Sequence, residues 1–305
     1  MNASINSSSV PSVTTGAIAG IVIRTACFLM GIGGNITVIV VLIRNFKKEN
    51  FTLKLMLNLA ASDIVCLSML PFWMWNLLSG WTADIHLCRL LSFVTYTAIH
   101  ASVLIVTLMS VQRYVVVLYR QQWSRLGRRG EFGVLVTVWV LAGMVSIAPT
   151  VTYNIITVEG SAKKCEQVFW SEEQKLAVVL FESMAVFLFP FSTLLVSYLC
   201  LHKKVSTKAL MSNQRLAKLV TCIVVTFIIF WTPYHIVNVM IMTSPSKPVQ
   251  AWLRVAYRPA RQVTQGIIYL NSCVNPLLYA FNYRSLRAPK PVSEVNTKET
   301  SNDTC

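Results

Sequence analysis

Long apolar stretches alternate with short polar ones along the whole chain. Seven of the apolar stretches are long enough to cross a bilayer, which takes about 20 helical residues. They cover residues 17–43, 52–78, 86–119, 132–153, 175–202, 214–242 and 259–281. We therefore predict an all-α membrane fold, a seven-transmembrane helix bundle. We find no internal repeat and no sign of a second domain.

The composition favours a membrane protein over a soluble domain. Hydrophobic residues make up 54% of the 305 residues and charged residues only 13%, whereas soluble domains carry about 25% charged residues. The net charge of +15 would suit nucleic acid, but the basic residues stand in short loops between apolar stretches. Because that arrangement sets membrane topology, we expect a multi-pass cell-membrane protein and no nucleic-acid partner.

The loop charges also predict an orientation. Basic residues gather in the first, third and fifth loops and after the last helix, so the N-terminus is expected outside and the C-terminus inside. Residues 1–16 then form an extracellular N-terminus, residues 17–281 the seven-helix transmembrane domain, and residues 282–305 a short cytoplasmic tail. Asn2 and Asn6 begin N-glycosylation sequons in the outer segment.

Two of the eight cysteines differ from the rest in their position. Most cysteines lie within apolar stretches, and no CxxC pair suggests a metal site. Cys88 and Cys165 instead fall at loop positions on the predicted outer, oxidising side, where a disulfide can persist. Such a bond would tie the third helix to the second outer loop.

Asp63 is the only carboxylate near the middle of the predicted membrane. A buried charge there needs polar partners or a cation. Candidate partners stand in the third and seventh apolar stretches: Ser102, Asn271, Ser272 and Asn275. From the residues alone, a sodium site and a purely structural hydrogen-bonded cluster stay open.

A series of motifs in this order resembles the class A (rhodopsin-like) G-protein-coupled receptors. Each motif is weak by itself, but together they touch all seven apolar stretches. They are Gly34-Asn35, Leu59-Ala60-Ala61-Ser62-Asp63, Cys88, Arg113-Tyr114, Trp139, Pro190 with Tyr198, Phe227-Ile-Ile-Phe-Trp231-Thr-Pro233, and Asn275-Pro276-Leu-Leu-Tyr279.

The resemblance implies a receptor that switches between states, not an enzyme. Phe227 and Trp231 would couple a ligand pocket to the core, and Pro233 would bend the sixth helix. Arg113, Tyr198 and Tyr279 would stabilise an inner cavity that accepts a heterotrimeric G protein, with arrestin as a further partner. The resemblance also assigns the Asp63 cluster to a sodium pocket, with sodium as an allosteric modulator and no other cofactor.

Two positions depart from the family pattern. The acid that usually precedes the arginine is Gln112 here, so an acid–arginine pair cannot form. We expect raised basal activity unless other contacts compensate. Arg120 and Gln121 stand where the family commonly has proline and an apolar residue, which leaves the choice of G protein open.

Two further positions disfavour common ligand classes within the family. Thr95 occupies the position of the aspartate that amine receptors use, and Ile268 that of the lysine to which opsins attach retinal. Basic residues gather instead near the outer end of the seventh helix. Arg261 is expected to reach a ligand carboxylate in a charge-assisted bond, and Arg254 is a second candidate. Lipid-headgroup contact or solvation is the alternative for such charges.

Other polar residues are expected to complete the ligand pocket. They are Glu182, Tyr234, His235, Tyr96 and His100. Within the family, local patterns such as Phe181-Glu182, Phe230-Trp231-Thr-Pro233-Tyr234-His235 and Arg261 resemble the chemoattractant lipid receptors, the leukotriene B4 receptors among them. Asn154 departs from that pattern, because an arginine would fit there.

The resemblance implies a dihydroxy eicosanoid ligand with one carboxylate, inhibitory G proteins, and a role in chemotaxis or inflammation. A chemoattractant peptide is the alternative ligand, although residues 1–16 carry no charged side chain. A transporter is disfavoured, since repeated halves around broken helices are not apparent. An intramembrane enzyme is disfavoured because His100, His235 and Asp63 are scattered along the chain.

Overall fold

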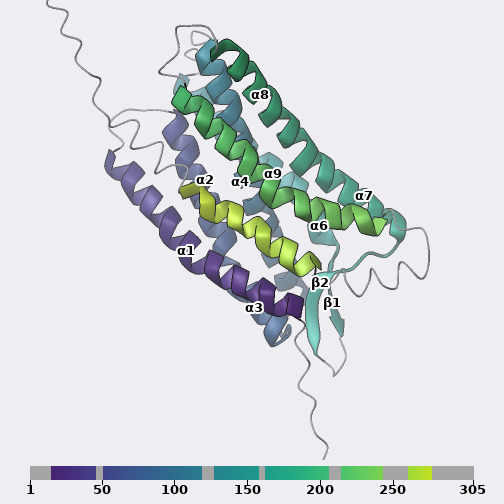
Figure 1. Ribbon diagram of the computed structural model, residues 1–305. Helices are drawn as coiled ribbons and strands as arrows, with labels where there is room; N and C mark the ends of the chain where they lie inside the picture. Colours follow the sequence, from purple (N-terminus) through teal and green to yellow (C-terminus); the bar gives the residue numbers. More distant parts are fainter. Residues whose placement is uncertain are drawn as a thin grey trace, which may run out of the picture.

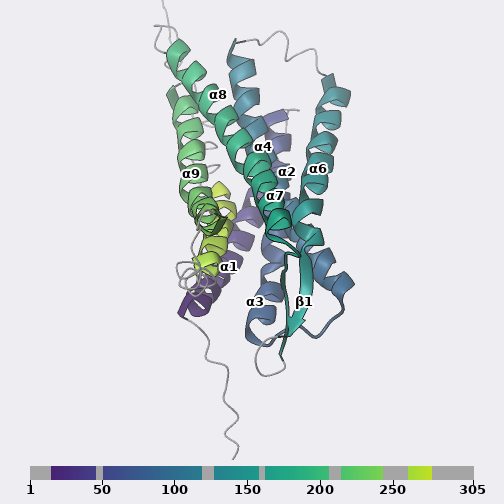
Figure 2. The same ribbon diagram turned by 90° about the vertical axis from the view of Figure 1, so that its right-hand side faces the viewer.

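A computed structural model describes residues 15–45, 51–118, 127–157, 162–205, 214–242 and 260–276. Its helices lie side by side in an elongated bundle, with a small β-hairpin at one end (Figures 1 and 2). In chain order the helices are α1 (Thr15–Asn45), α2 (Phe51–Ser68), α3 (Leu70–Leu78), α4 (Ile85–Leu118), α6 (Gly127–Val151), α7 (Glu172–Glu182), the π-helix η1 (Ser183–Leu188), α8 (Phe189–Val205), α9 (Gln214–Met242), and a last helix over residues 260–276.

Five helical spans within the described residues are long and apolar enough to cross a membrane. They are Ile18–Arg44, Phe51–Leu78, Ile85–Val116, Gly127–Val151 and Glu172–Cys200. The predicted sixth stretch coincides with α9, in which Val225–Met240 is described as apolar. Residues 260–276 cover most of the predicted seventh stretch.

The core of the bundle lies around α4. About two thirds (67%) of its apolar span is buried, against 28% in α1 and in α6. The helix packs against α2, α6 and α8, and its Ala101, Ile105 and Met109 belong to the main buried cluster. Large apolar side chains such as Leu29 and Phe132 are exposed on the outer helices, as expected for surfaces in contact with lipid.

Two of the predicted continuous spans are interrupted. The second divides at Met69 into α2 and α3, and Pro71 stands in the first turn of α3, where its missing N–H costs no helical bond. The fifth consists of α7, η1 and α8, with the π-helix just before Pro190. Wide π turns are common at functional sites.

The β-hairpin was not predicted from the sequence. Strands β1 (Tyr153–Thr157) and β2 (Lys163–Gln167) pair antiparallel, with Tyr153 opposite Gln167 and Ile155 opposite Cys165. The hairpin adds a small sheet to the otherwise helical fold. Residues 158–162 between the strands contain no Asn-Gly or Asp-Gly pair, which is the strongest hairpin signal in a sequence.

Contacts from α3, α4 and Trp81 fasten the hairpin to the helices. The disulfide between Cys88 and Cys165 joins it to α4, with 5.9 Å between the Cα atoms, and confirms the predicted pairing. Asn76 of α3 donates to the Cys165 carbonyl (2.9 Å) and accepts from the Cys165 N–H (3.0 Å). Trp81 N–H donates to the Lys163 carbonyl, and Gly80 beside it has φ +84°, which favours glycine.

Candidate functional site

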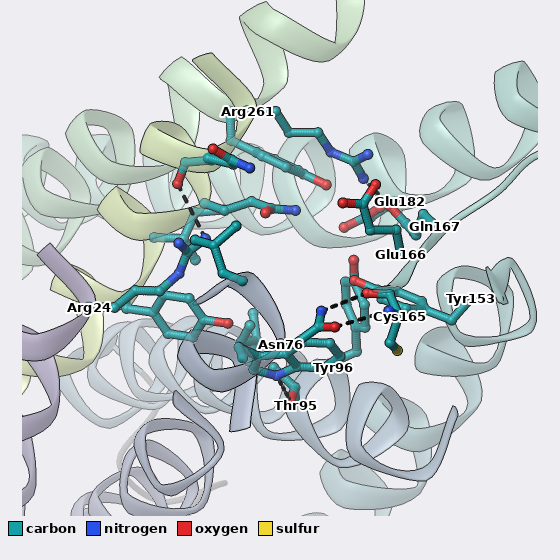
Figure 3. Close-up of a pocket in the computed structure, with 18 of the residues that line it drawn as sticks. Arg24, Asn76, Thr95, Tyr96, Tyr153, Cys165, Glu166, Gln167, Glu182 and Arg261 are labelled. Atoms are coloured by element: carbon teal, nitrogen blue, oxygen red, sulfur yellow. Dashed lines mark hydrogen bonds between the residues drawn. The ribbon is translucent and has the colours of Figure 1, made fainter. Parts of the chain in front are cut away.

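A cavity of about 450 Å³ lies under the hairpin. Its walls come from α1, α3, α4, α7, α9 and residues 260–276, and both strands contribute (Figure 3). Its size is within the range of small-molecule sites. Apolar and aromatic groups such as Leu77, Ile99 and Trp231 line it together with charged and amide side chains.

Four of the predicted ligand residues line this cavity: Arg261, Glu182, Tyr234 and Tyr96. Arg261 Nη2 donates to Gln167 Oε1. Glu182 is buried, hydrogen-bonded to Tyr234 and close enough to Arg261 for electrostatic attraction. Figure 3 shows the Arg261 guanidinium directed toward Glu182 and Gln167. These groups form a polar cluster on the α7 side of the cavity.

The other predicted ligand residues lie elsewhere. His100 pairs through Nδ1 with Ser146 Oγ (2.8 Å) between α4 and α6 and does not line the cavity. His235 Nδ1 lies 3.0 Å from Ser183 Oγ, and its ring stacks on Phe187 with centroids 4.6 Å apart; it too lies outside the cavity. Arg254 is outside the described residues.

The structure adds polar residues that the sequence interpretation missed. Arg24 enters the cavity from α1, Gln167 and Tyr153 come from the hairpin, and Gln262 and Gln265 come from the last helix. Arg24 carried a sequence signal, because a lone arginine within a membrane span is costly and suggests function. The hairpin residues carried none, since their place depends on strand pairing.

Tyr153 closes the cavity from the hairpin side. Its ring lies 5.7 Å from Trp73 and 6.1 Å from Tyr96, centroid to centroid. Burial raises the pKa of Tyr153 above its ordinary value, so the phenol is neutral at physiological pH. It can therefore donate a hydrogen bond to a ligand oxygen or accept one from a ligand hydroxyl.

Deeper in the bundle, Asp63 is fully buried and hydrogen-bonded on both oxygens. Ser102 Oγ donates to Oδ1 (3.0 Å) and Asn275 Nδ2 donates to Oδ2 (2.7 Å). Asn35 Nδ2 of α1 donates to the backbone carbonyl of Ser272 (3.0 Å). The cluster therefore joins α1, α2, α4 and the last helix.

The chemistry of this cluster suits a sodium ion. A carboxylate with hydroxyl and amide oxygens nearby is the ligand set that hard cations prefer. Ser102, Asn271 and Ser272 line a small cavity of about 10 Å³, close to the volume of one water probe. Asp63 and Asn275 complete the set that would hold the ion.

Trp231 is among the residues that line both cavities. Its ring stacks on Phe227 with centroids 5.8 Å apart, and Pro233 follows inside α9. Tyr198 lies in α8 and packs at the edge of the main buried cluster. Among the other predicted switch residues, Tyr279 and the side chain of Arg113 are outside the described residues. Asn2 and Asn6 are also outside them.

Gln112 has a partner near the other end of α4. Its Nε2 donates to Thr52 Oγ1 (3.0 Å), and the Thr52 hydroxyl lies 3.2 Å from Gln112 Oε1. Both side chains are buried. This neutral contact links α4 to α2 at the position where the family usually has an acid.

Comparison with known proteins agrees with the motifs. Residues 34–279 match the family described as 7 transmembrane receptor (rhodopsin family). The chain is 30% identical to G-protein coupled receptor E1 of equine herpesvirus 2 over 266 residues, covering 83% of this chain and 68% of that protein. It is 30% identical to rat leukotriene B4 receptor 1 over 268 residues (85% and 75%). It is 31% identical to mouse C-C chemokine receptor type 8 over 264 residues (83% and 73%).

The match spans most of the chain, and the relatives are receptors rather than enzymes. It confirms the predicted G-protein-coupled receptor function, the coupling to G proteins that this implies, and a multi-pass location in the cell membrane. The chain belongs to the rhodopsin family of 7 transmembrane receptors.

Proposed function

We propose that this receptor responds to an anionic lipid mediator and that leukotriene B4 is its ligand. The observation that carries the proposal is the cavity under the hairpin, where the guanidinium groups of Arg24 and Arg261 stand among aromatic and apolar walls. An acidic lipid needs both features. Its carboxylate binds a guanidinium by charge-assisted bonds, and its chain packs against groups such as Ile99, Ile268 and Trp231.

The polar cluster around Arg261 suits the hydroxyl groups of a dihydroxy eicosanoid. Arg261 and Tyr234 supply donors, while Glu182 supplies a buried acceptor. The similarity to rat leukotriene B4 receptor 1 supports the same ligand. Signalling on the cytoplasmic side would use a heterotrimeric G protein of the inhibitory class, with arrestin as a second partner. The biological role would be in chemotaxis or inflammation.

A chemoattractant peptide remains the second candidate, because mouse C-C chemokine receptor type 8 is similar to this chain at the same level. The position of the hairpin over the cavity favours the lipid. The hairpin lies across one end, and the disulfide and Asn76 hold it there. A lipid acid is small enough to be buried beneath it, whereas a protein ligand would bind across the outer surface.

The remaining assignments follow from this function. We propose seven membrane spans with the N-terminus outside, residues 1–16 as the outer segment and residues 282–305 as the cytoplasmic tail. Sodium would bind at Asp63, Ser102, Asn271, Ser272 and Asn275. Ligand contact with Trp231 would pass through Phe227 and Pro233 to α9, whose inner end opens for the G protein with help from Arg113, Tyr198 and Tyr279.

G-protein activation in cells that express the full chain tests this proposal. We expect a saturable response to leukotriene B4 that untransfected cells lack. Arg261→Ala should weaken it by about 10-fold or more, the value of a lost hydrogen bond to a charged group. Phe132→Ala, on an exposed apolar surface of α6, is the control and should leave the response unchanged. Activation by a chemokine with silence toward all lipid acids would refute the proposal.

A further inference from the structure

The two arginines in the cavity differ in the charges that surround them. Arg261 lies on the side of Glu182 and is also held by Gln167. Glu166 lines the cavity from the same hairpin strand as Gln167. Figure 3 shows Arg261, Glu182, Gln167 and Glu166 gathered on one side and Arg24 on the other. The positive charge of Arg261 is therefore attracted to an acid of the protein, Glu182.

Arg24 has no such compensation among the described residues. Its side chain is only 7% exposed. Nη2 donates to the backbone carbonyl of Gln262 (3.3 Å), and Nε has no hydrogen-bond partner in the described part of the chain. Its electrostatic neighbours are Tyr269, Tyr153 and Cys27, side chains that are ordinarily uncharged at neutral pH. A buried cation with one neutral bond is costly, and an anion would relieve that cost.

The chain leaves space for this guanidinium. Gly20 stands one turn before Arg24 on α1, and a Cβ there would lie 2.9 Å from Arg24 Nη1 and 3.3 Å from the Gln262 carbonyl oxygen. Glycine therefore lets the guanidinium lie against the last helix and face the cavity. Because the Arg24 side chain is only 7% exposed, its burial argues against a role as a headgroup anchor at the membrane surface.

We propose that Arg24 is the carboxylate subsite of the cavity, and that Arg261 binds the hydroxyl groups of the same ligand. This inference rests on the proposed function and states which polar group of the ligand each arginine binds. A carboxylate placed at Arg261 would be repelled by Glu182, whereas one at Arg24 meets no acid among the described residues. The cluster of Arg261, Glu182 and Tyr234 offers donors and an acceptor together, which is what a hydroxyl needs.

The test compares each lipid acid with its methyl ester, which removes the charge and keeps the rest of the molecule. Activation and competition binding are measured on the full chain and on four variants: Arg24→Gln, Arg24→Lys, Gly20→Ala and Arg261→Gln. The quantity of interest is the ratio of ester to acid affinity on the same variant. Because the acid and the ester are measured on the same preparation of folded receptor, a change in expression level does not alter this ratio.

Wild type should prefer leukotriene B4 to its ester by about 10- to 100-fold, the range of a charge-assisted bond. Arg24→Gln should abolish that preference while leaving ester affinity unchanged. Arg24→Lys should keep part of it, and Gly20→Ala should reduce it by displacing the guanidinium without removing its charge. Arg261→Gln should weaken acid and ester alike and keep the preference.

The outcomes separate the two proposals. A preference that survives Arg24→Gln and disappears in Arg261→Gln would overturn the assignment of the subsites. A wild-type receptor that ignores leukotriene B4 but responds to another lipid acid would refute the proposed ligand, and the ester ratio of that acid would then decide the role of Arg24. Silence toward every acid and ester would refute both.

Discussion

The cavity under the hairpin and the Asp63 cluster both bury polar groups inside the bundle, but they satisfy them differently. Around Asp63 each carboxylate oxygen accepts a bond from a neighbouring helix, and the space left measures about 10 Å³. Under the hairpin, a space of about 450 Å³ remains. Arg24 Nε and Gln262 Oε1 have no partner there among the described residues.

The difference indicates two roles. Since unpaired buried polar groups cost free energy, the bonds to both Asp63 oxygens stabilise the protein, while the unpaired groups under the hairpin are suited to an organic ligand. Trp231 touches both spaces. A ligand that moves this ring from above would therefore disturb the packing around Asp63 below, which gives the two regions a physical route of coupling.

The largest effect should come from breaking the hydrogen bonds to Asp63. Asp63→Leu leaves Ser102 Oγ and Asn275 Nδ2 without their acceptor, at a cost of about 2–4 kcal/mol in the free energy of unfolding. We expect a lower melting temperature of the solubilised receptor and reduced surface expression. Asp63→Asn keeps an acceptor oxygen and is the matched control, with a smaller loss. Equal stability of wild type and Asp63→Leu would show that these hydrogen bonds contribute nothing net.

The same two variants sharpen the sodium proposal. If the cluster holds sodium in the inactive state, replacing sodium by a bulky organic cation should raise agonist affinity of wild type by about 5-fold or more, the lower range of allosteric couplings. Asp63→Asn should lose this dependence, since the anionic ligand is gone. Sodium dependence that persists in Asp63→Asn would place the ion elsewhere.

A moderate effect is expected where the hairpin is fastened over the cavity. Asn76→Ala leaves the N–H and carbonyl of Cys165 without their side-chain partner. Because the hairpin is then held less firmly over the cavity, we expect agonist affinity to fall by about 10-fold. Asn58→Ala is the control, because Asn58 accepts a bond from Trp139 away from the cavity. Competition binding measures both. Equal affinity in the two variants would mean that the hairpin position does not affect the ligand.

The smallest effect concerns basal signalling. Gln112 and Thr52 make a neutral contact where an acid–arginine pair usually restrains the inactive state. Thr52→Val removes it, and a hydrogen bond of about 1 kcal/mol predicts a rise in ligand-free signal of about 5-fold. Gln112→Asp should lower the signal by restoring the acid. Unchanged basal activity in Thr52→Val would show that this contact is not a restraint.

The sequence predicted the helical framework well because its signals are local. Apolar stretches placed α4 at 86–119 against the observed Ile85–Leu118, and the sixth stretch at 214–242 coincides with α9. The disulfide could be predicted since only Cys88 and Cys165 fall at loop positions on the predicted outer side, and the structure joins them. The break at Met69 and the π-helix η1 were not predicted, because tertiary packing decides how a span bends near Pro71 or Pro190.

The site was only partly predictable for the same reason. Arg261 and Glu182 stood out as charged residues within apolar stretches, and both line the cavity. His100 lies one helical turn after the cavity residue Tyr96, and His235 directly follows Tyr234. Their rings nevertheless pair with Ser146 and Ser183. Which side of a helix faces a cavity depends on rotation and on neighbours that spacing does not reveal. Arg24 was passed over although an arginine inside a membrane span is itself a signal.

Saturation binding of radiolabelled leukotriene B4 to membranes from cells that express the full chain tests the central claim most directly. We predict specific, saturable binding that excess unlabelled acid displaces, that its methyl ester displaces only at about 10- to 100-fold higher concentration, and that Arg24→Gln weakens. Absence of specific binding to well-expressed receptor, with specific binding of a labelled chemokine to the same membranes, would contradict the account.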